Sequence, residues 1–232
     1  MTKLSVNINK IALIRNSRKG NNPSLEFFSR KIIEAGADGI TVHPRPDQRH
    51  IRADDLSDLA EVAHQLNVEF NIEGNPYEES DGDYPGFLNL IESVKPSQCT
   101  LVPDDTNQLT SDHGWNIHSE QDKLKAVLEY LRTNNIRSSI FLDPDKSQLD
   151  AAKDIGVDRV EIYTGPFAEA FKKEDEKTLA TYESAIQYAN EISLELNAGH
   201  DLNLENIATL LSYGEIKEVS IGHALILSLI HI

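Results

Sequence analysis

The chain has 232 residues, of which 39% are hydrophobic, and it carries a formal net charge of −16 at pH 7. Its length and apolar content suffice for one large core, and they fit a single α/β barrel or two small domains. So negative a field repels polyanions, which argues against nucleic acid and anionic membranes as partners.

The sequence carries no signal for export or membrane insertion. Met1-Thr2-Lys3 does not lead into the apolar stretch of a signal peptide, and no apolar run is long enough to span a membrane. The one cysteine, Cys99, excludes an internal disulfide and a site with several cysteine ligands. We therefore expect a cytoplasmic protein.

The predicted elements alternate between strand and helix along the chain. Apolar and polar residues alternate over 4–9, which predicts a strand with Asn7 and Asn9 on one face. A long loop is expected over 10–20, and apolar spacing predicts a helix over 23–35, with Pro23 in its first turn. The further predicted strands are 40–42, 68–73, 99–102, 139–142, 160–163, 194–196 and 219–221, and the further predicted helices are 53–66, 87–94, 120–133, 147–155, 177–191 and 204–211.

This order of elements predicts a closed barrel. Strict alternation indicates a parallel sheet, and eight strands, each followed by a helix or the start of one, indicate a (β/α)₈ TIM barrel. An open doubly wound sheet usually has a glycine-rich turn after its first strand, where this chain has Asn9-Lys10-Ile11. We predict an α/β fold in which residues 1–232 form one domain with a parallel, eight-stranded closed sheet.

The segment after the second predicted strand is rich in arginine and histidine. Pro44 and Pro46 prevent a regular strand or helix, so side chains from His43 onward project from a loop at the carboxyl end of the strand. Arginine matches phosphate oxygens in pairs, and histidine gains or loses a proton near neutral pH. We interpret this loop as part of a site; the alternative is a solvated basic turn.

In a barrel, residues at the carboxyl ends of all strands converge on one mouth. In this sequence those residues are nearly all polar, and they combine acid–base groups with groups suited to anions. They are Asn7, Asn9, His43, Arg45, Glu73, Asp143, Glu161, Asn197, His200, Gly222 and His223.

Two turns near the C-terminus are the most informative. Gly222-His223 lies where the eighth strand meets its helix, a place at which barrels commonly bind phosphate through backbone N–H groups. The segment 197–201 follows the seventh predicted strand and presents His200. For each, the alternative is a glycine turn with an incidental histidine. Asp104-Asp105 and Asp143-Pro144-Asp145 could form a Mg²⁺ site, but both also suit turns or helix caps, and we predict no metal.

A series of motifs, in order from about Leu4 to Ala224, covers nearly the whole chain. The motifs are 6–9, 15–18, 36–45, 49–51, 71–73, 100–103, 197–200 and 221–224. As a set they resemble the pyridoxine 5′-phosphate synthase family of vitamin B6 biosynthesis. The resemblance implies a (β/α)₈ barrel, usually octameric, that uses no metal or organic cofactor. It also implies that two small phosphorylated substrates, 3-amino-2-oxopropyl phosphate and 1-deoxy-D-xylulose 5-phosphate, are condensed to pyridoxine 5′-phosphate, phosphate and water.

The resemblance also implies roles for individual residues. Proton transfer falls on His43, Glu73 and His200. Binding of the aminoketone phosphate falls on Asn7, Arg18, Asp201, Gly222 and His223. Binding of the pentulose phosphate falls on Asn9, Lys10, Arg45, His50 and Thr110.

The chain departs from the family pattern at three places. Many members have Asp-His where this chain has Asn9-Lys10, and Asp201 replaces a frequent glycine. The almost wholly apolar segment 224–232 stands where the family has a longer amphipathic helix, so we expect a shortened last helix that a neighbouring subunit covers; the alternative is a truncated end. Two alternatives remain open: another barrel isomerase or lyase that acts on phosphorylated sugars, and a degenerate, non-catalytic barrel.

Overall fold

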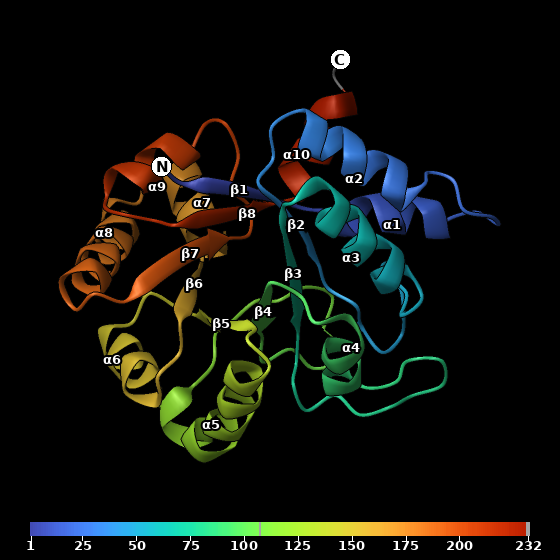
Figure 1. Cartoon of the computed structure of the whole chain (residues 1–232). Coiled ribbons are helices and arrows are strands. Elements are labelled where there is room, and N and C mark those ends of the chain that lie inside the picture. The colour runs from blue at the N-terminus through green and yellow to red at the C-terminus, as the bar shows by residue number, and fades with distance from the viewer. Residues whose placement is uncertain (107, 231–232) are drawn as a thin grey trace.

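Eight parallel strands close into one barrel in the computed structural model of the chain, which describes residues 1–106 and 108–230 (Figure 1). Each strand pairs with its neighbours in chain order, and β8 pairs with β1 to complete the ring. The strands are β1 (Lys3–Asn7), β2 (Gly39–Val42), β3 (Glu69–Gly74), β4 (Gln98–Leu101), β5 (Arg137–Leu142), β6 (Arg159–Tyr163), β7 (Glu195–Gly199) and β8 (Glu218–Ile221). The predicted eight-stranded closed sheet is confirmed.

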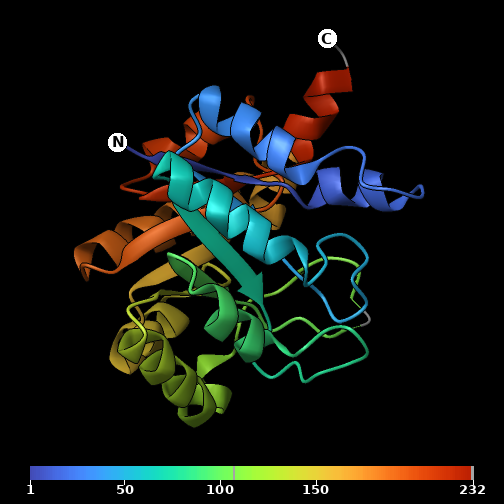
Figure 2. The ribbon, with the colours of Figure 1, turned by 45° about the vertical axis from the view of Figure 1, so that its right-hand side comes forward.

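Helices cover the outside of the sheet, as both views of the ribbon show (Figures 1 and 2). They are α1 (Asn9–Asn16), α2 (Leu25–Glu34), α3 (Asp55–Leu66), α4 (Phe87–Val94), α5 (Ile117–Thr133), α6 (Lys146–Ile155), α7 (Gly165–Lys173), α8 (Glu176–Glu191), α9 (Ile207–Ser212) and α10 (His223–Ile230). Figure 2 also shows the loops after β2, β3 and β4 lying side by side at one end of the barrel.

The hydrophobic core lies between the sheet and the helices. Alternate strand residues such as Ile40, Ile72 and Ile140 are fully buried in that layer. The other set of strand side chains faces the barrel interior and is largely polar: Ser5 and Thr41 hydrogen-bond across β1 and β2 at 2.7 Å. This polar interior leads directly to the mouth, so the strands can present charged groups there without crossing the apolar core.

Helix α1 occupies most of the segment for which the sequence predicted a loop, so the predicted loop over 10–20 is wrong. Ile11, Ala12 and Arg15 recur at helical spacing and are buried on one face. Asn9 begins this helix instead of ending β1, and it therefore does not share a strand face with Asn7.

Three further predictions of local structure need correction. Helix α2 begins at Leu25, not at Pro23, because the Ser24 side chain accepts a hydrogen bond from the backbone N–H of Phe27 and caps the helix. Helix α7 was not predicted; it is short, and its apolar face buries Phe167. Strand β7 extends to Gly199, three residues beyond its predicted end.

The other predicted elements overlap observed ones, and α4 has the predicted bounds. Helix α10 follows β8 directly and contacts α1. Residues 231 and 232 of the predicted short last helix lie outside the described residues.

Candidate active site

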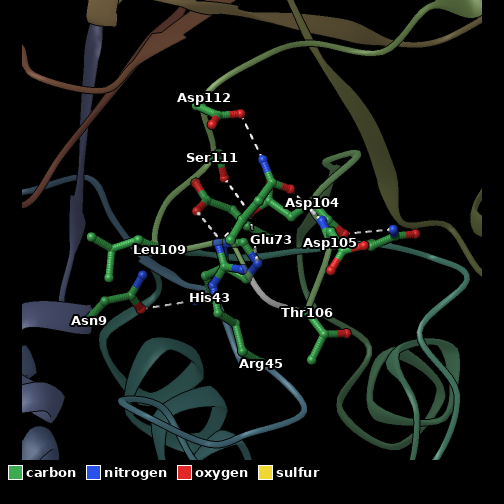
Figure 3. A network of polar contacts seen from close by, with 12 residues as sticks. Asn9, His43, Arg45, Glu73, Asp104, Asp105, Thr106, Leu109, Ser111 and Asp112 are labelled. Carbon is green, nitrogen blue, oxygen red and sulfur yellow. Dashed lines mark hydrogen bonds and ion pairs between the residues drawn. The ribbon is translucent and has the colours of Figure 1, made fainter.

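A buried imidazole faces a buried carboxyl group where β2 and β3 end. His43 directly follows β2, Glu73 belongs to β3, and the His43 Nδ1 and Glu73 Oε2 atoms are 3.8 Å apart. The backbone N–H of His43 donates to Asn9 Oδ1 at 3.0 Å, and Asn7 Nδ2 donates to Glu73 Oε2 at 3.5 Å. Two asparagines therefore position the pair, as Figure 3 shows for Asn9.

The surroundings of this pair oppose charge on either partner. Burial raises the pKa of Glu73 well above its usual value, and the neighbouring carboxyl groups of Glu161 and Asp104 raise it further. Burial lowers the pKa of His43 well below 6.5, and the neighbouring Arg45 lowers it further. Both shifts favour the uncharged forms, a protonated carboxyl group and a neutral imidazole, so the first can donate a proton and the second can accept one.

Arg45 forms a buried ion pair with Asp104 beside His43 (Figure 3). Arg45 Nη2 donates to Asp104 Oδ2, and the Ser111 hydroxyl donates to the same oxygen at 2.7 Å. From the sequence, Asp104 suits either a Mg²⁺ site or a turn or helix cap, and nothing there singles out Ser111. The available signal was its position, because Asp104 closely follows β4 at the same rim as Arg45.

Several polar atoms in this cluster are buried and, within residues 1–106 and 108–230, have no hydrogen-bond partner. They are His43 Nε2, Arg45 Nη1, Asp104 Oδ1 and His200 Nδ1. Buried polar groups are normally hydrogen-bonded, so unpartnered ones at a barrel mouth mark atoms that a polar ligand can satisfy. Donors, acceptors and imidazoles together suit a ligand with phosphate, carbonyl and hydroxyl groups.

His200 belongs to the same rim. It directly follows β7, and its ring packs on Phe141 and Tyr163, with ring centroids 4.9 and 5.4 Å away. Burial lowers the pKa of His200. The charge of Asp104 raises this pKa, and the charge of Arg45 lowers it. His200 is also among the groups whose charge lowers the pKa of His43.

The turn that presents His200 is tight. His200 and Asp201 have φ angles of +82° and +57°, a left-handed conformation that costs energy in residues other than glycine. The Thr164 hydroxyl lies 2.6 Å from the carbonyl oxygens of both Gly199 and His200 and holds the turn. The sequence placed this turn at 197–201, whereas β7 includes residues up to Gly199 and the turn is His200-Asp201.

Glu161 and Asn197 were predicted at strand ends, and this is wrong for both, because each lies within its strand inside the barrel. Burial and the charge of Glu218 raise the pKa of Glu161 to about 8. Its carboxyl group lies under Gly199, where an added Cβ would be 2.2 Å from Glu161 Oε1. Asn197 Nδ2 donates instead to Gln98 Oε1 at 3.3 Å.

His50 and Lys10 lie next to the cluster. The rings of His50 and His43 are 6.3 Å apart, and His50 Nδ1 accepts a hydrogen bond from the backbone N–H of Ile51 at 2.9 Å. Burial and the charge of Arg45 lower the pKa of His50 to about 3, and Lys10 on α1 adds to this effect. His50 is therefore neutral near pH 7, and its other ring nitrogen, Nε2, can form a hydrogen bond but carries no positive charge.

The turn between β8 and α10 approaches β1 closely. A Cβ on Gly222 would lie 2.6 Å from the carbonyl oxygen of Asn7, so this position requires glycine unless the backbone shifts. The other predicted binding residues are exposed and lie outside the buried cluster within the described part of the chain. They are Arg18, Thr110, Asp201 and His223.

Neither a metal centre nor a membrane helix is found in the part of the chain that the structure describes. There, no three or more His, Cys, Asp or Glu side chains are grouped as metal ligands would be. No helix there combines the length and the apolar character needed to cross a membrane.

A closed parallel barrel with buried acid–base groups and an arginine at its carboxyl rim defines the class as a TIM-barrel enzyme. The model of one family, "Pyridoxal phosphate biosynthesis protein PdxJ", matches residues 4–232. The chain therefore belongs to the PdxJ family, the pyridoxine 5′-phosphate synthases of pyridoxal phosphate biosynthesis. This confirms the family and the enzyme class that the sequence resemblance implied.

Individual relatives agree with this assignment. The chain is 48% identical over 227 residues to the pyridoxine 5′-phosphate synthase of Xanthomonas axonopodis pv. citri, covering 97% of this chain and 89% of that one. It is also 48% identical to the enzyme of that name from Christiangramia forsetii, covering 97% of this chain and 92% of that one.

Solved structures with little sequence identity share only the barrel fold. A tryptophan synthase chain from M. tuberculosis has a TM-score of 0.65 at 11% identity, covering 99% of this chain and 86% of that one. A thiamine phosphate pyrophosphorylase from Pyrococcus furiosus has a TM-score of 0.59 at 10% identity, covering 95% and 85%.

Proposed function

We propose that the chain condenses 3-amino-2-oxopropyl phosphate with 1-deoxy-D-xylulose 5-phosphate to form pyridoxine 5′-phosphate, phosphate and water. The family supports this reaction. The observation that supports it most directly is the buried pair of His43 and Glu73 at the barrel mouth, with a separation of 3.8 Å. Such a pair suits a reaction in which almost every step moves a proton.

We assign proton transfer to His43, Glu73 and His200. The amine of one substrate adds to the ketone of the other, the carbinolamine loses water, phosphate departs, and a carbon–carbon bond closes the ring. The raised pKa of Glu73 favours its protonated form, so it donates to departing oxygen. His43 is neutral because its pKa is lowered, so it removes protons from nitrogen or carbon. His200 serves the opposite side of the mouth.

Two groups of residues hold the substrates by their phosphates in this proposal. The aminoketone phosphate is bound by Asn7, Arg18, Asp201, Gly222 and His223. The pentulose phosphate is bound by Asn9, Lys10, Arg45, His50 and Thr110. The close approach of Gly222 to β1 supports the first pocket, because bare backbone N–H groups at the start of α10 attract phosphate. Two anchored phosphates would fix the reacting carbons relative to each other.

We further propose that residues 1–232 form one cytoplasmic barrel domain that assembles as a homo-octamer. Leu13 and Ile14 on α1 and Leu227 on α10 are exposed, and association would cover such side chains. The buried free thiol of Cys99 fits a reducing compartment. Light scattering of the purified protein measures the assembly directly, and a monomer at micromolar concentration would contradict the octamer.

The test of the reaction is to mix the purified protein with both substrates and to follow pyridoxine 5′-phosphate by its absorbance. Product should appear only when both substrates are present. A folded sample that forms no product would contradict the proposal. Binding of only one phosphorylated substrate in calorimetry would instead favour a barrel isomerase or lyase.

A further inference from the structure

Asp104 covers the guanidinium group that the proposed function assigns to the pentulose phosphate, and the inference drawn here rests on that function. The two side chains are 3% and 0% exposed, so their charges meet with almost no solvent around them. A phosphate and the Asp104 carboxylate cannot both neutralise one arginine in so small a volume without repelling each other. One must give way to the other.

The ion pair uses only part of each group. Arginine and carboxylate form their strongest pair through two parallel hydrogen bonds, yet here only Arg45 Nη2 donates, and only to Asp104 Oδ2. Arg45 Nη1 and Asp104 Oδ1 are buried and, in the described residues, have no partner. The contact is therefore incomplete on both sides, as expected of a partner that can be exchanged.

Asp104 can release Arg45 without a change in its own backbone. Its carbonyl oxygen accepts a hydrogen bond from Asn75 Nδ2 at 2.9 Å, which fixes the main chain to the loop after β3. Besides Arg45, the carboxylate is held by the Ser111 hydroxyl at 2.7 Å, and His43 Nε2 lies 4.0 Å from the same oxygen, Asp104 Oδ2. Rotation of the side chain moves the charge, while Arg49 keeps the rest of the loop in place through the carbonyl oxygens of Thr106 and Gln108, at 3.1 and 2.9 Å.

We propose that Asp104 is a specificity-determining residue, a built-in competitor that a phosphate dianion displaces from Arg45 and that a monoanion does not. A phosphate dianion carries more charge than the carboxylate and can accept from both Nη atoms of Arg45 at once. A chloride ion or a simple carboxylate only replaces one negative charge by another, so it gains little. The pocket thereby selects the phosphorylated pentulose over the abundant small anions of the cell.

The test compares Asp104→Asn with the unaltered protein in calorimetry, with 1-deoxy-D-xylulose 5-phosphate as the ligand and with acetate replacing chloride in one series. Asparagine keeps the shape and the acceptor for Ser111 but removes the competing charge. Binding of the pentulose phosphate should tighten about tenfold. Chloride and acetate at about 0.1 M should weaken binding to the variant and leave the unaltered protein nearly unaffected.

The matched control is Asp112→Asn. Asp112 lies on the same loop, but its carboxylate is exposed and pairs with His113 at 2.7 Å. The Asp112→Asn variant should change neither the affinity for the pentulose phosphate nor the effect of chloride on it. An effect as large as that of Asp104→Asn would show that the affinity depends on the net charge of the loop and not on the contact with Arg45. A second variant, Ser111→Ala, loosens the hold on Asp104 without changing charge, and it should tighten binding by a smaller factor.

The outcomes separate this inference from the function on which it rests. If the unaltered protein does not bind the pentulose phosphate, both fail. If it binds and turns over both substrates, but Asp104→Asn binds equally or more weakly, the function stands and the role of Asp104 as a competitor is overturned. A fall in kcat with an unchanged Kd would also overturn it, because Asp104 would then act on the chemistry.

Discussion

At the scale of single residues, burial works against the usual order in which His43 and Glu73 hold protons. In water a carboxyl group loses its proton well before an imidazole does. Here the pKa of Glu73 is raised and that of His43 is lowered, mainly by burial in both cases. The sequence predicts that both residues lie at strand ends, but it contains no measure of burial and therefore does not predict these two opposite shifts.

Glu73→Gln should abolish most of the activity, since glutamine keeps the hydrogen bond from Asn7 but cannot donate or accept the transferred proton. Loss of a general acid–base group typically lowers kcat by about 10²–10⁴-fold. Initial rates with both substrates measure this. Glu92→Gln, an exposed change on α4, serves as the control and should leave kcat unchanged. Full activity in Glu73→Gln would refute the assignment.

The pH dependence of the rate should reflect the raised pKa of Glu73. If chemistry requires the protonated carboxyl group, kcat/KM should fall only above the raised pKa, at a higher pH than an ordinary glutamate would cause. An ordinary glutamate would already be ionised above about pH 5. His43 has a lowered pKa, so it should cause no loss of rate between pH 6 and 7. A fall in kcat/KM as the pH rises from 4 to 5 would contradict a requirement for protonated Glu73.

At the scale of elements, α1 shows why a buried arginine was mistaken for a loop residue. Arg15 falls in the segment 10–20, for which the sequence predicts a loop, yet it is 1% exposed in the structure. Its guanidinium group makes two hydrogen bonds to Asp55 of α3, at 2.6 and 2.9 Å, and one to the carbonyl oxygen of His50 at 3.0 Å. The partners are about 40 residues away, so no local pattern reveals them.

Arg15→Ala should therefore destabilise the fold and loosen the loop that carries His50. Removing one partner of a buried ion pair leaves the other without compensation and costs about 3 kcal/mol. Urea denaturation measures the loss. Arg132→Ala provides the comparison, because Arg132 pairs with Glu129 on the exposed surface of α5 and should contribute less than about 0.5 kcal/mol. Equal effects of the two changes would argue against a structural role for Arg15.

At the scale of the whole molecule, the barrel interior is largely polar. Glu73, Glu161 and Glu218 all face it, and the pKa of each is raised, above all by burial. Such an interior gains stability when its carboxyl groups stay protonated. The strands keep the apolar core on their outer side, so these buried acids do not disrupt it.

Over a range of pH, Glu161 is ionised in the unfolded chain but still protonated in the folded protein. The free energy of unfolding should fall as the pH rises through this range. Its pKa is raised from 4.5 to about 8 in the folded protein, so its contribution is complete below 4.5 and is lost towards 8. Glu161→Gln should remove this dependence of stability on pH. Between pH 5 and 9 the unaltered protein should therefore lose stability relative to the variant, on the order of 3 kcal/mol.

Thermal unfolding of the two proteins across this pH range checks the prediction. The control is Glu183→Gln, whose carboxylate is exposed on α8 and accepts from Gln187 at 3.2 Å. Parallel curves for Glu161→Gln and the unaltered protein would mean that Glu161 is already ionised in the fold.

The sequence by itself determined the barrel, its strand order and the residues that follow the strands, because hydrophobic periodicity and turn residues are local properties. It determined the family as well, because the motifs occur in one order along the chain. Only the tertiary structure decided that Asp104 neutralises Arg45, that Arg15 is buried, and that Glu161 and Asn197 lie inside the barrel. These facts depend on distances between segments far apart in the chain and on exclusion of water, and neither is encoded in the order of neighbouring residues.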